Sequence, residues 1–250
     1  MVESLKETFL QKQVETPDGN QLPLHSHTSE SQGYFLQEMF DLIKPKSTLE
    51  VGMAYGISSL FILEKHREYK NPEKSHLIIE PYSWQGVAEH YFEKEKLSYL
   101  TDIRYKKSDE VLPKLYYESH RIQYAYIDTT KLFDVVMQDV YFIDKILDVN
   151  GVLILDDCGG YWPGIQKVAR FLNSLPHYKF LKGHKKYTHR VRRELGENLT
   201  SLFLNMVPFR KKFISELNLK TNHHLGLEYR CIAFQKISED KRNWDWDRPL

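Results

Sequence analysis

The sequence predicts an α/β fold: a doubly wound, mostly parallel sheet of about seven strands, helices on both faces and the last strand antiparallel. Two observations support this prediction. Strand-length apolar runs alternate repeatedly with helix-length segments between residues 47 and 175, which is typical of βαβ units. After Pro176 the alternation ends, and two further strand-like runs follow at 177–183 and 228–237.

The segment before the alternating region predicts two helices separated by a turn. Residues 3–13 predict a short helix, and Pro17-Asp18-Gly19 places a turn within 15–23, since proline and glycine suit turn positions. Thr28 or Ser29 can cap a second helix, which has apolar residues at helical spacing and ends before Pro45. We treat residues 1–28 as an N-terminal extension of a single domain spanning 1–250.

The alternating region predicts five pairs of a strand followed by a helix. Apolar or β-branched composition marks the strands, and a helical spacing of apolar residues marks the helices. The predicted strands are 47–52, 76–81, 102–108, 124–128 and 151–157, and the helices that follow them are 58–67, 83–97, 110–118, 131–147 and 164–175. Residues 184–225 form an insert between the last two strands, which we expect to shape an acceptor pocket or an interface.

Composition excludes several classes of protein. Of 250 residues, 41% are hydrophobic, so the chain can build a core. Lys and Arg number 35 against 34 Asp and Glu, a balance that argues against a general binder of nucleic acid or membrane surfaces. Two cysteines give no disulfide framework, which favours a reducing cytoplasm. The N-terminal residues lack the pattern of a signal peptide, and no apolar run is long enough to span a membrane.

The turn after the first predicted strand is the first candidate binding site. It reads LEVGMAYGISS, with Gly52 and Gly56 where the chain must turn tightly and Ser58 at the start of a helix. Ligands of open parallel sheets bind beyond the carboxyl ends of the strands. Glu80 ends the next strand, where a carboxylate can hold a ribose diol. A G-x-G-x-x-G pattern is absent, which disfavours a nicotinamide oxidoreductase.

At these residues the sequence resembles the class I S-adenosylmethionine-dependent methyltransferases, and within them the metal-dependent O-methyltransferases of the catechol and caffeoyl-CoA type. The turn has the E-x-G-x-x-x-G-x-S form of that group, the helix at 31–43 matches the one that leads into the turn, and KSDEVLPKL matches the stretch that faces adenine. The resemblance covers about residues 28–180 and implies a Rossmann-like fold.

The resemblance implies S-adenosylmethionine as the cofactor and assigns residues to it. Most of them lie in the glycine turn, at the end of the second strand or at the start of the helix after the third strand. The predicted cofactor-binding residues are Glu50, Gly52, Tyr55, Gly56, Ser58, Glu80, Tyr82, Ser108, Asp109 and Asp128.

Three carboxylates follow the fourth and fifth strands of the alternating region. Asp128 ends one strand, and Asp156 and Asp157 end the next. In the sheet of the resembling family these strands are neighbours, so the three acids would meet and raise one another's pKa. The resemblance implies that they bind a divalent cation, and hard oxygen ligands favour Mg²⁺. The alternative for the Asp156–Asp157 pair is a helix cap and a solvated acid.

Lys131 matches the lysine of the family's Asp-x-x-Lys pattern, which implies a general base beside Asp128 as the second catalytic residue. An ordinary lysine pKa of about 10.4 is too high for that role, and a nearby cation and partial burial are expected to lower it to roughly 7–8. The metal would hold the acceptor oxyanion while the methyl group passes in line to oxygen. The alternative is a surface lysine at the start of a helix.

Several further residues are weaker candidates. His25 and His27 precede the helix at 29–43 and can line an acceptor pocket or lie in a loop. Tyr82 and Trp84 can pack on adenine, Tyr161 and Trp162 can wall the acceptor site, and Cys158 is expected to fill space.

A basic cluster near the start of the insert bears on the acceptor. It contains Lys185, Lys186, Arg190, Arg192 and Arg193, which suit either an anionic small-molecule acceptor or a solvated helix face. We expect no membrane partner and disfavour nucleic acid, while a homodimer stays open.

The leading hypothesis is thus metal-assisted methyl transfer from S-adenosylmethionine to a hydroxyl of a small molecule. Two alternatives stay open: a metal-independent methyltransferase acting on a sugar or nitrogen acceptor, and a cofactor-binding protein without catalysis. Joint retention of Asp128, Lys131, Asp156 and Asp157 argues against the second alternative.

Overall fold

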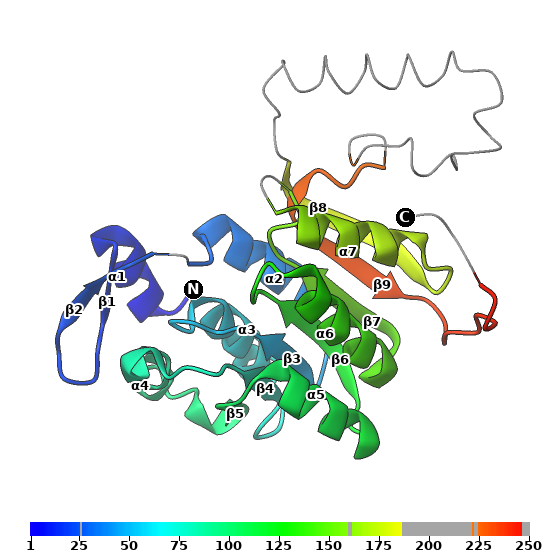
Figure 1. The fold of residues 1–250 in the computed structure, drawn as a ribbon. Coiled ribbons are helices and arrows are strands. Elements are labelled where there is room, and N and C mark those ends of the chain that lie inside the picture. The colour runs from blue at the N-terminus through cyan, green and yellow to red at the C-terminus, as the bar shows by residue number, and fades with distance from the viewer. Residues whose placement is uncertain (26, 160–161, 187–221, 223–224, 247–250) are drawn as a thin grey trace, which may run out of the picture.

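The computed structural model describes residues 1–25, 27–159, 162–186, 222 and 225–246. Within these residues a seven-stranded sheet has the order β5-β4-β3-β6-β7-β9-β8 (Figure 1). The strands are β3 Thr48–Val51, β4 His76–Ile79, β5 Thr101–Arg104, β6 Ile122–Ile127, β7 Leu147–Leu155, β8 Tyr178–Lys186 and β9 Tyr229–Lys236.

The direction of the strands confirms the predicted topology. β3 pairs in parallel with β4 on one side and with β6 on the other, and β5 and β7 continue the parallel pairing outward. β9 is antiparallel to both β7 and β8. Strand order therefore reverses between β3 and β6, which is where open α/β sheets bind ligands.

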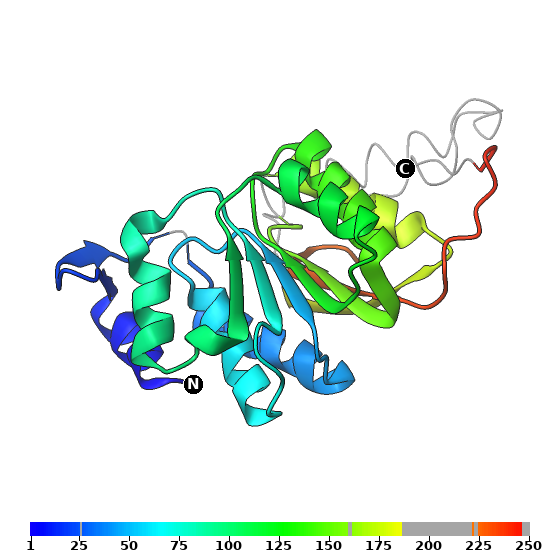
Figure 2. The same cartoon turned by 90° about the horizontal axis from the view of Figure 1, so that it is seen from below.

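Helices cover both faces of the sheet, as the sequence predicts (Figure 2). α5, α6 and α7 pack with sheet residues such as Leu153 in one apolar cluster, and α2 packs against the opposite face in another that contains Tyr124. The helices are α2 Glu30–Ile43, α3 Ile57–Glu68, α4 Val87–Lys94, α5 Ser108–Tyr117, α6 Phe133–Ile146 and α7 Pro163–Ser174. Because β3 and β4 are covered on both sides, all their residues are buried, including the polar Thr48 and Glu50 of β3.

The N-terminal extension adds structure that the sequence predicted only in part. α1 Glu3–Gln11 corresponds to the predicted first helix. The predicted turn is flanked by two strands, β1 Gln13–Glu15 and β2 Gln21–Pro23, which form a hairpin. Each strand has three residues, too few to give a period-two pattern.

Two other boundaries differ from the prediction. The strand predicted at 102–108 ends at Arg104, and Ser108 is the first residue of α5. The insert predicted at 184–225 begins later, because β8 continues to Lys186, and most of it, including Arg190, Arg192 and Arg193, lies outside the described residues. Among the described helices, none combines the length and apolar character needed to cross a membrane.

Candidate active site

A cavity of about 840 Å³ lies at the carboxyl ends of β3, β4 and β6. Its walls include the turn after β3, the ends of β4 and β6, the start of α5 and the segment after β7. The position matches the reversal of strand order in the sheet. The predicted cofactor site and the predicted acid cluster therefore share one cavity.

Gly52 brings the ends of β3 and β6 into close contact. Its φ of +89° favours glycine, and a Cβ at this position would lie 1.9 Å from the backbone oxygen of Asp128. Gly56 has a φ of +78° and is the residue from which α3 begins; a Cβ there would lie 2.8 Å from the Cβ of Ala88. Both glycines are thus required by local geometry.

Glu50 supports the glycine turn from below the cavity. The hydroxyls of Ser58 and Ser59 donate to its carboxylate, and Nε2 of His76 lies 3.0 Å from Oε2. Glu50 is fully buried and is not a wall residue of the cavity. Its carboxylate therefore fixes the first turn of α3, and its predicted contact with the cofactor stays a prediction.

Glu80 lies in the cavity wall and holds the backbone of the turn. Its Oε2 accepts hydrogen bonds from the backbone N–H of Met53 at 2.9 Å and of Ala54 at 3.0 Å, and Oε1 accepts one from the backbone N–H of Tyr82 at 3.0 Å. A carboxylate has about four lone-pair sites, so these three bonds leave capacity for about one further donor, such as one hydroxyl of a ribose.

The other predicted cofactor residues divide into two groups. Those in the cavity wall are Gly52, Tyr55, Ser58, Tyr82, Ser108, Asp109 and Asp128. Gly56, like Glu50, lies behind the wall. Trp84 and His27 also line the cavity, and the hydroxyl of Tyr55 lies 3.1 Å from Nε2 of His25.

The three predicted metal ligands converge at one end of the cavity. Asp128, Asp156 and Asp157 each offer an oxygen, and these oxygens lie within 4.8 Å of one another. Successive strand residues point to opposite faces, but β7 ends at Leu155 and Asp157 has a φ of +53°, so the two adjacent carboxylates can meet. Burial, together with the charge of Asp156, raises the pKa of Asp128 to about 6, against the opposing effect of Lys131.

Lys131 lies between two of these acids. Its Nζ is 2.9 Å from Oδ1 of Asp128 and 2.9 Å from Oδ2 of Asp157. Burial alone would lower the pKa of Lys131, but the two carboxylates outweigh burial and raise the pKa above its ordinary value. This direction is opposite to the fall that the sequence analysis attributes to a bound cation, because here the acids act on Lys131 directly.

Arg230, at the start of β9, is a cavity residue that the sequence analysis missed. Its Nε lies 3.7 Å from Oδ1 of Asp156. The thiol of Cys231 donates to the same oxygen at 2.9 Å. Its strand was predicted, but the place of that strand beside the end of β7 is known only from the structure.

The remaining candidates after β7 fall in different places. Trp162 lines the cavity and is 46% exposed, whereas Tyr161 lies outside the described residues. Cys158 is fully buried in the apolar cluster with Leu155 and Ile232, as expected of a space-filling residue.

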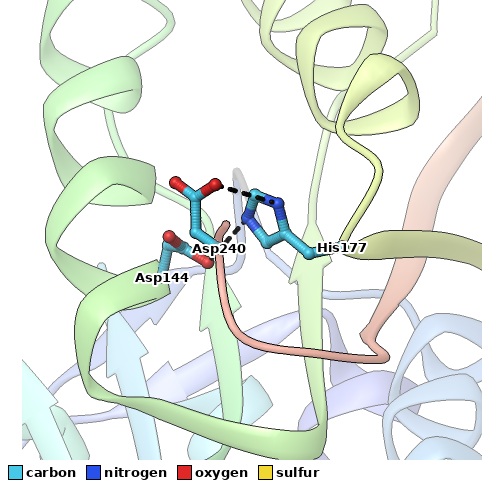
Figure 3. Close-up of side chains that lie close together, drawn as sticks. All are labelled: Asp144, His177 and Asp240. Atoms are coloured by element: carbon cyan, nitrogen blue, oxygen red, sulfur yellow. Dashed lines mark ion pairs between the residues drawn. The ribbon is translucent and has the colours of Figure 1, made fainter. Parts of the chain in front are cut away.

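A second group of potential ligands lies away from the cavity. His177 lies between Asp144 on α6 and Asp240 after β9, with nitrogen–oxygen distances of 3.3 and 3.6 Å (Figure 3). Arg242 pairs with Asp240 at 2.7 Å, and the ammonium of the buried Lys236 lies 3.8 Å from Asp144. Because each carboxylate already has a cation of the chain, a divalent ion would add uncompensated charge. We interpret this group as a structural ion cluster.

The fold is the one that the resemblance to class I, S-adenosylmethionine-dependent methyltransferases implies. Residues 49–158 match a family model described as a methyltransferase domain. A comparison with curated proteins found no match. The resemblance inferred from the glycine turn is therefore confirmed at the level of the enzyme class.

Solved structures with the same fold include three methyltransferases. The O-methyltransferase TomG from Streptomyces achromogenes, solved with S-adenosylmethionine, is 16% identical with a TM-score of 0.54, over 62% of this chain and 73% of its own. The O-methyltransferase from Bacillus cereus, solved with S-adenosylhomocysteine, is 17% identical with a TM-score of 0.58, over 72% and 83%. The methyltransferase PaMTH1 of Podospora anserina is 19% identical with a TM-score of 0.56, over 72% and 83%. At these identities the likeness concerns the fold.

Proposed function

We propose that the protein transfers the methyl group of S-adenosylmethionine to a hydroxyl of a small-molecule acceptor, assisted by a divalent cation such as Mg²⁺. The observation that carries this proposal is the position of Lys131 between Asp128 and Asp157, in the cavity that the glycine turn also lines. Lys131 and the predicted cofactor site thus face one space.

The cofactor half of the proposal is supported by the turn after β3 and by Glu80. The hydrogen bonds from Met53 and Ala54 to Glu80 fix the carboxylate beside the turn before any ligand arrives. The start of α5, with Ser108 and Asp109, forms another wall where adenine is expected. When bound, S-adenosylmethionine supplies an electrophilic methyl group, so the protein's task is to align the acceptor with it.

The metal half of the proposal is supported by the donor set. Three carboxylates supply the hard oxygen ligands that Mg²⁺ prefers. Burial, and after it the charge of Asp156, raises the pKa of Asp128 despite the ammonium of Lys131, so a further cation at this point would favour the ionised carboxylate. The residues therefore fit a divalent cation, which would supply a Lewis acid that makes an acceptor hydroxyl more acidic.

Lys131 is proposed to take the proton of the acceptor hydroxyl. It can act as a base only when Asp128 and Asp157 hold its charge less strongly than they do here, because at present they raise its pKa. Asp128 and Asp157 then act as positioning groups that keep the amine at the acceptor end of the cavity.

A second candidate is metal-independent methyl transfer. The specific observation in its favour is that Lys131 and Arg230 already offset part of the charge of the three acids. In that case Lys131 stays an ammonium and orients the acceptor.

The two free cysteines, both buried, fit the predicted reducing cytoplasm.

The experiment that tests the proposal is methyl transfer in a panel of catechols, hydroxylated aromatic acids and CoA esters. Mass spectrometry should find a product that gains one methyl group, and Mg²⁺ should raise the rate while a chelator lowers it. Calorimetry with S-adenosylhomocysteine should show that Glu80→Ala weakens binding by at least about tenfold, because hydrogen bonds to a charged group are lost. If the wild type binds neither form of the cofactor, the proposal fails.

A further inference from the structure

Among the described residues, Arg230 has more unused hydrogen-bond donors than Lys131, the other cation at the acid end of the cavity. Lys131 is engaged by two carboxylates at 2.9 Å each. Arg230 approaches Asp156 only to 3.7 Å, beyond the usual length of about 2.7–2.9 Å for a charge-assisted hydrogen bond. Its Nε is buried without a hydrogen-bond partner among the described residues.

The carboxylate of Asp156 is also a poor partner for the whole guanidinium. Its Oδ1, the oxygen nearest to Arg230, already accepts the thiol proton of Cys231 at 2.9 Å. A guanidinium presents five N–H donors in a planar fork that matches a carboxylate with two parallel bonds. Asp156 therefore accounts for the charge of Arg230 but leaves most of its donors unused.

Arg230 is a residue of the cavity wall. Arg230 lines the cavity with 28% of its side chain exposed, and Asp156 and Asp157 line the same end. Trp162 adds a large aromatic surface to the wall. An anionic group on a ligand beside the acid cluster would be repelled by the aspartates unless a cation of the chain faced it.

We propose that Arg230 determines acceptor specificity by binding a carboxylate on the acceptor, so that the substrates are hydroxylated acids. This inference rests on the proposed function and narrows its acceptor class. Arg230 would orient the acceptor by a bidentate contact, leaving Lys131 to face the hydroxyl.

The test uses two catechols that differ in charge, protocatechuate and the neutral protocatechuyl alcohol. Calorimetry is done on the full chain saturated with S-adenosylhomocysteine and Mg²⁺. The wild type should prefer the carboxylated probe by about tenfold or more, and Arg230→Gln should abolish that preference while leaving the neutral probe within about twofold. Arg230→Lys should keep part of the preference for the carboxylated probe, because an ammonium keeps the positive charge but lacks the planar pair of N–H donors of a guanidinium.

Matched controls separate this role from a structural one. Lys107→Gln removes another cation of the cavity wall and should leave the preference unchanged. If Arg230→Gln lowers the melting temperature but keeps the preference, Arg230 is only the counter-ion of Asp156 and the inference is wrong. Equal binding of both probes by the wild type, or binding of neither, also overturns it. Failure to bind S-adenosylhomocysteine would instead overturn the proposed function.

Discussion

Two groups of acidic residues in this protein have similar composition and opposite surroundings. Asp128, Asp156 and Asp157 line a cavity, and Lys131 lies between two of them. Asp144 and Asp240 flank the buried His177 and are each paired with a basic residue (Figure 3).

The pKa values of the two groups move in opposite directions. Burial, with the charge of Asp156, raises the pKa of Asp128. Burial would also raise the pKa of Asp144, but His177 and Lys236 outweigh it and the pKa falls. The hydrogen bond from Arg242 lowers the pKa of Asp240. The comparison teaches that a cluster which stabilises the fold satisfies its charges internally, whereas one suited to a ligand does not.

The largest expected effect is on catalysis at the cavity cluster. Lys131→Met keeps the bulk of the side chain and removes the proton acceptor, so turnover should fall by about 10²–10⁴. Turnover by Lys131→Arg should also be slow, since a guanidinium stays protonated and cannot accept the proton. Steady-state kinetics with the best acceptor of the panel measures this effect.

Cofactor binding is the control for Lys131. S-adenosylhomocysteine should bind the variants as it binds the wild type, because Lys131 is not assigned to the cofactor. Wild-type turnover by Lys131→Met would show that the lysine is not the base.

The next effect distinguishes the two clusters by stability. Asp144→Asn removes a buried partner of His177 and Lys236 and should cost about 3 kcal/mol of unfolding free energy. Asp128→Asn should cost less than about 1 kcal/mol or stabilise the protein, because it removes repulsion with Asp156. Denaturant unfolding of both variants near neutral pH measures this difference. Equal losses of unfolding free energy in the two variants would contradict the proposed difference between the two clusters.

A smaller effect concerns pH. The folded pKa of Asp128, about 6, lies above the ordinary value near 3.9, so its contribution to stability is present below about pH 4 and is lost as pH rises through 6. The folded pKa of Asp144 is lowered, so its contribution is present above about pH 4 and is lost on acidification.

Unfolding curves at several pH values, compared between the wild type and the two variants, test these signs. The stability of Asp128→Asn relative to the wild type should be roughly 1–2 kcal/mol greater at pH 7 than at pH 4. The loss caused by Asp144→Asn should shrink below pH 4. Parallel pH profiles for the wild type and Asp128→Asn would show that the raised pKa of Asp128 has no effect on folding.

The sequence predicted the cavity cluster and missed the ion cluster for a physical reason. The cavity acids end strands, and the ends of neighbouring parallel strands meet at one edge of the sheet, so strand order alone brings Asp128 and the Asp156–Asp157 pair together. Asp144 comes from the last turns of α6, His177 from the turn before β8, and Asp240 from the segment after β9. No periodic pattern relates such positions.

No sequence pattern revealed the position of Arg230 or the N-terminal hairpin either. The strand that carries Arg230 was predicted, but its neighbour in the sheet follows from topology and not from residue type. The hairpin strands β1 and β2 are too short for a pattern. What the sequence did predict, the alternation of strands and helices and the glycine turn, depends on local composition and on steric rules that act within a few residues.

The central claim is that the cavity cluster binds a divalent cation and the ion cluster does not. The most direct measurement is the melting temperature with and without Mn²⁺, compared among the wild type, the double variant Asp156→Asn and Asp157→Asn, and Asp144→Asn. Binding stabilises the folded state by about 2.7 kcal/mol at a cation concentration one hundred times Kd. The metal-induced rise in melting temperature should be absent from the double variant, retained in Asp144→Asn and reversed by a chelator. An unchanged rise in the double variant would contradict the account and place the metal elsewhere.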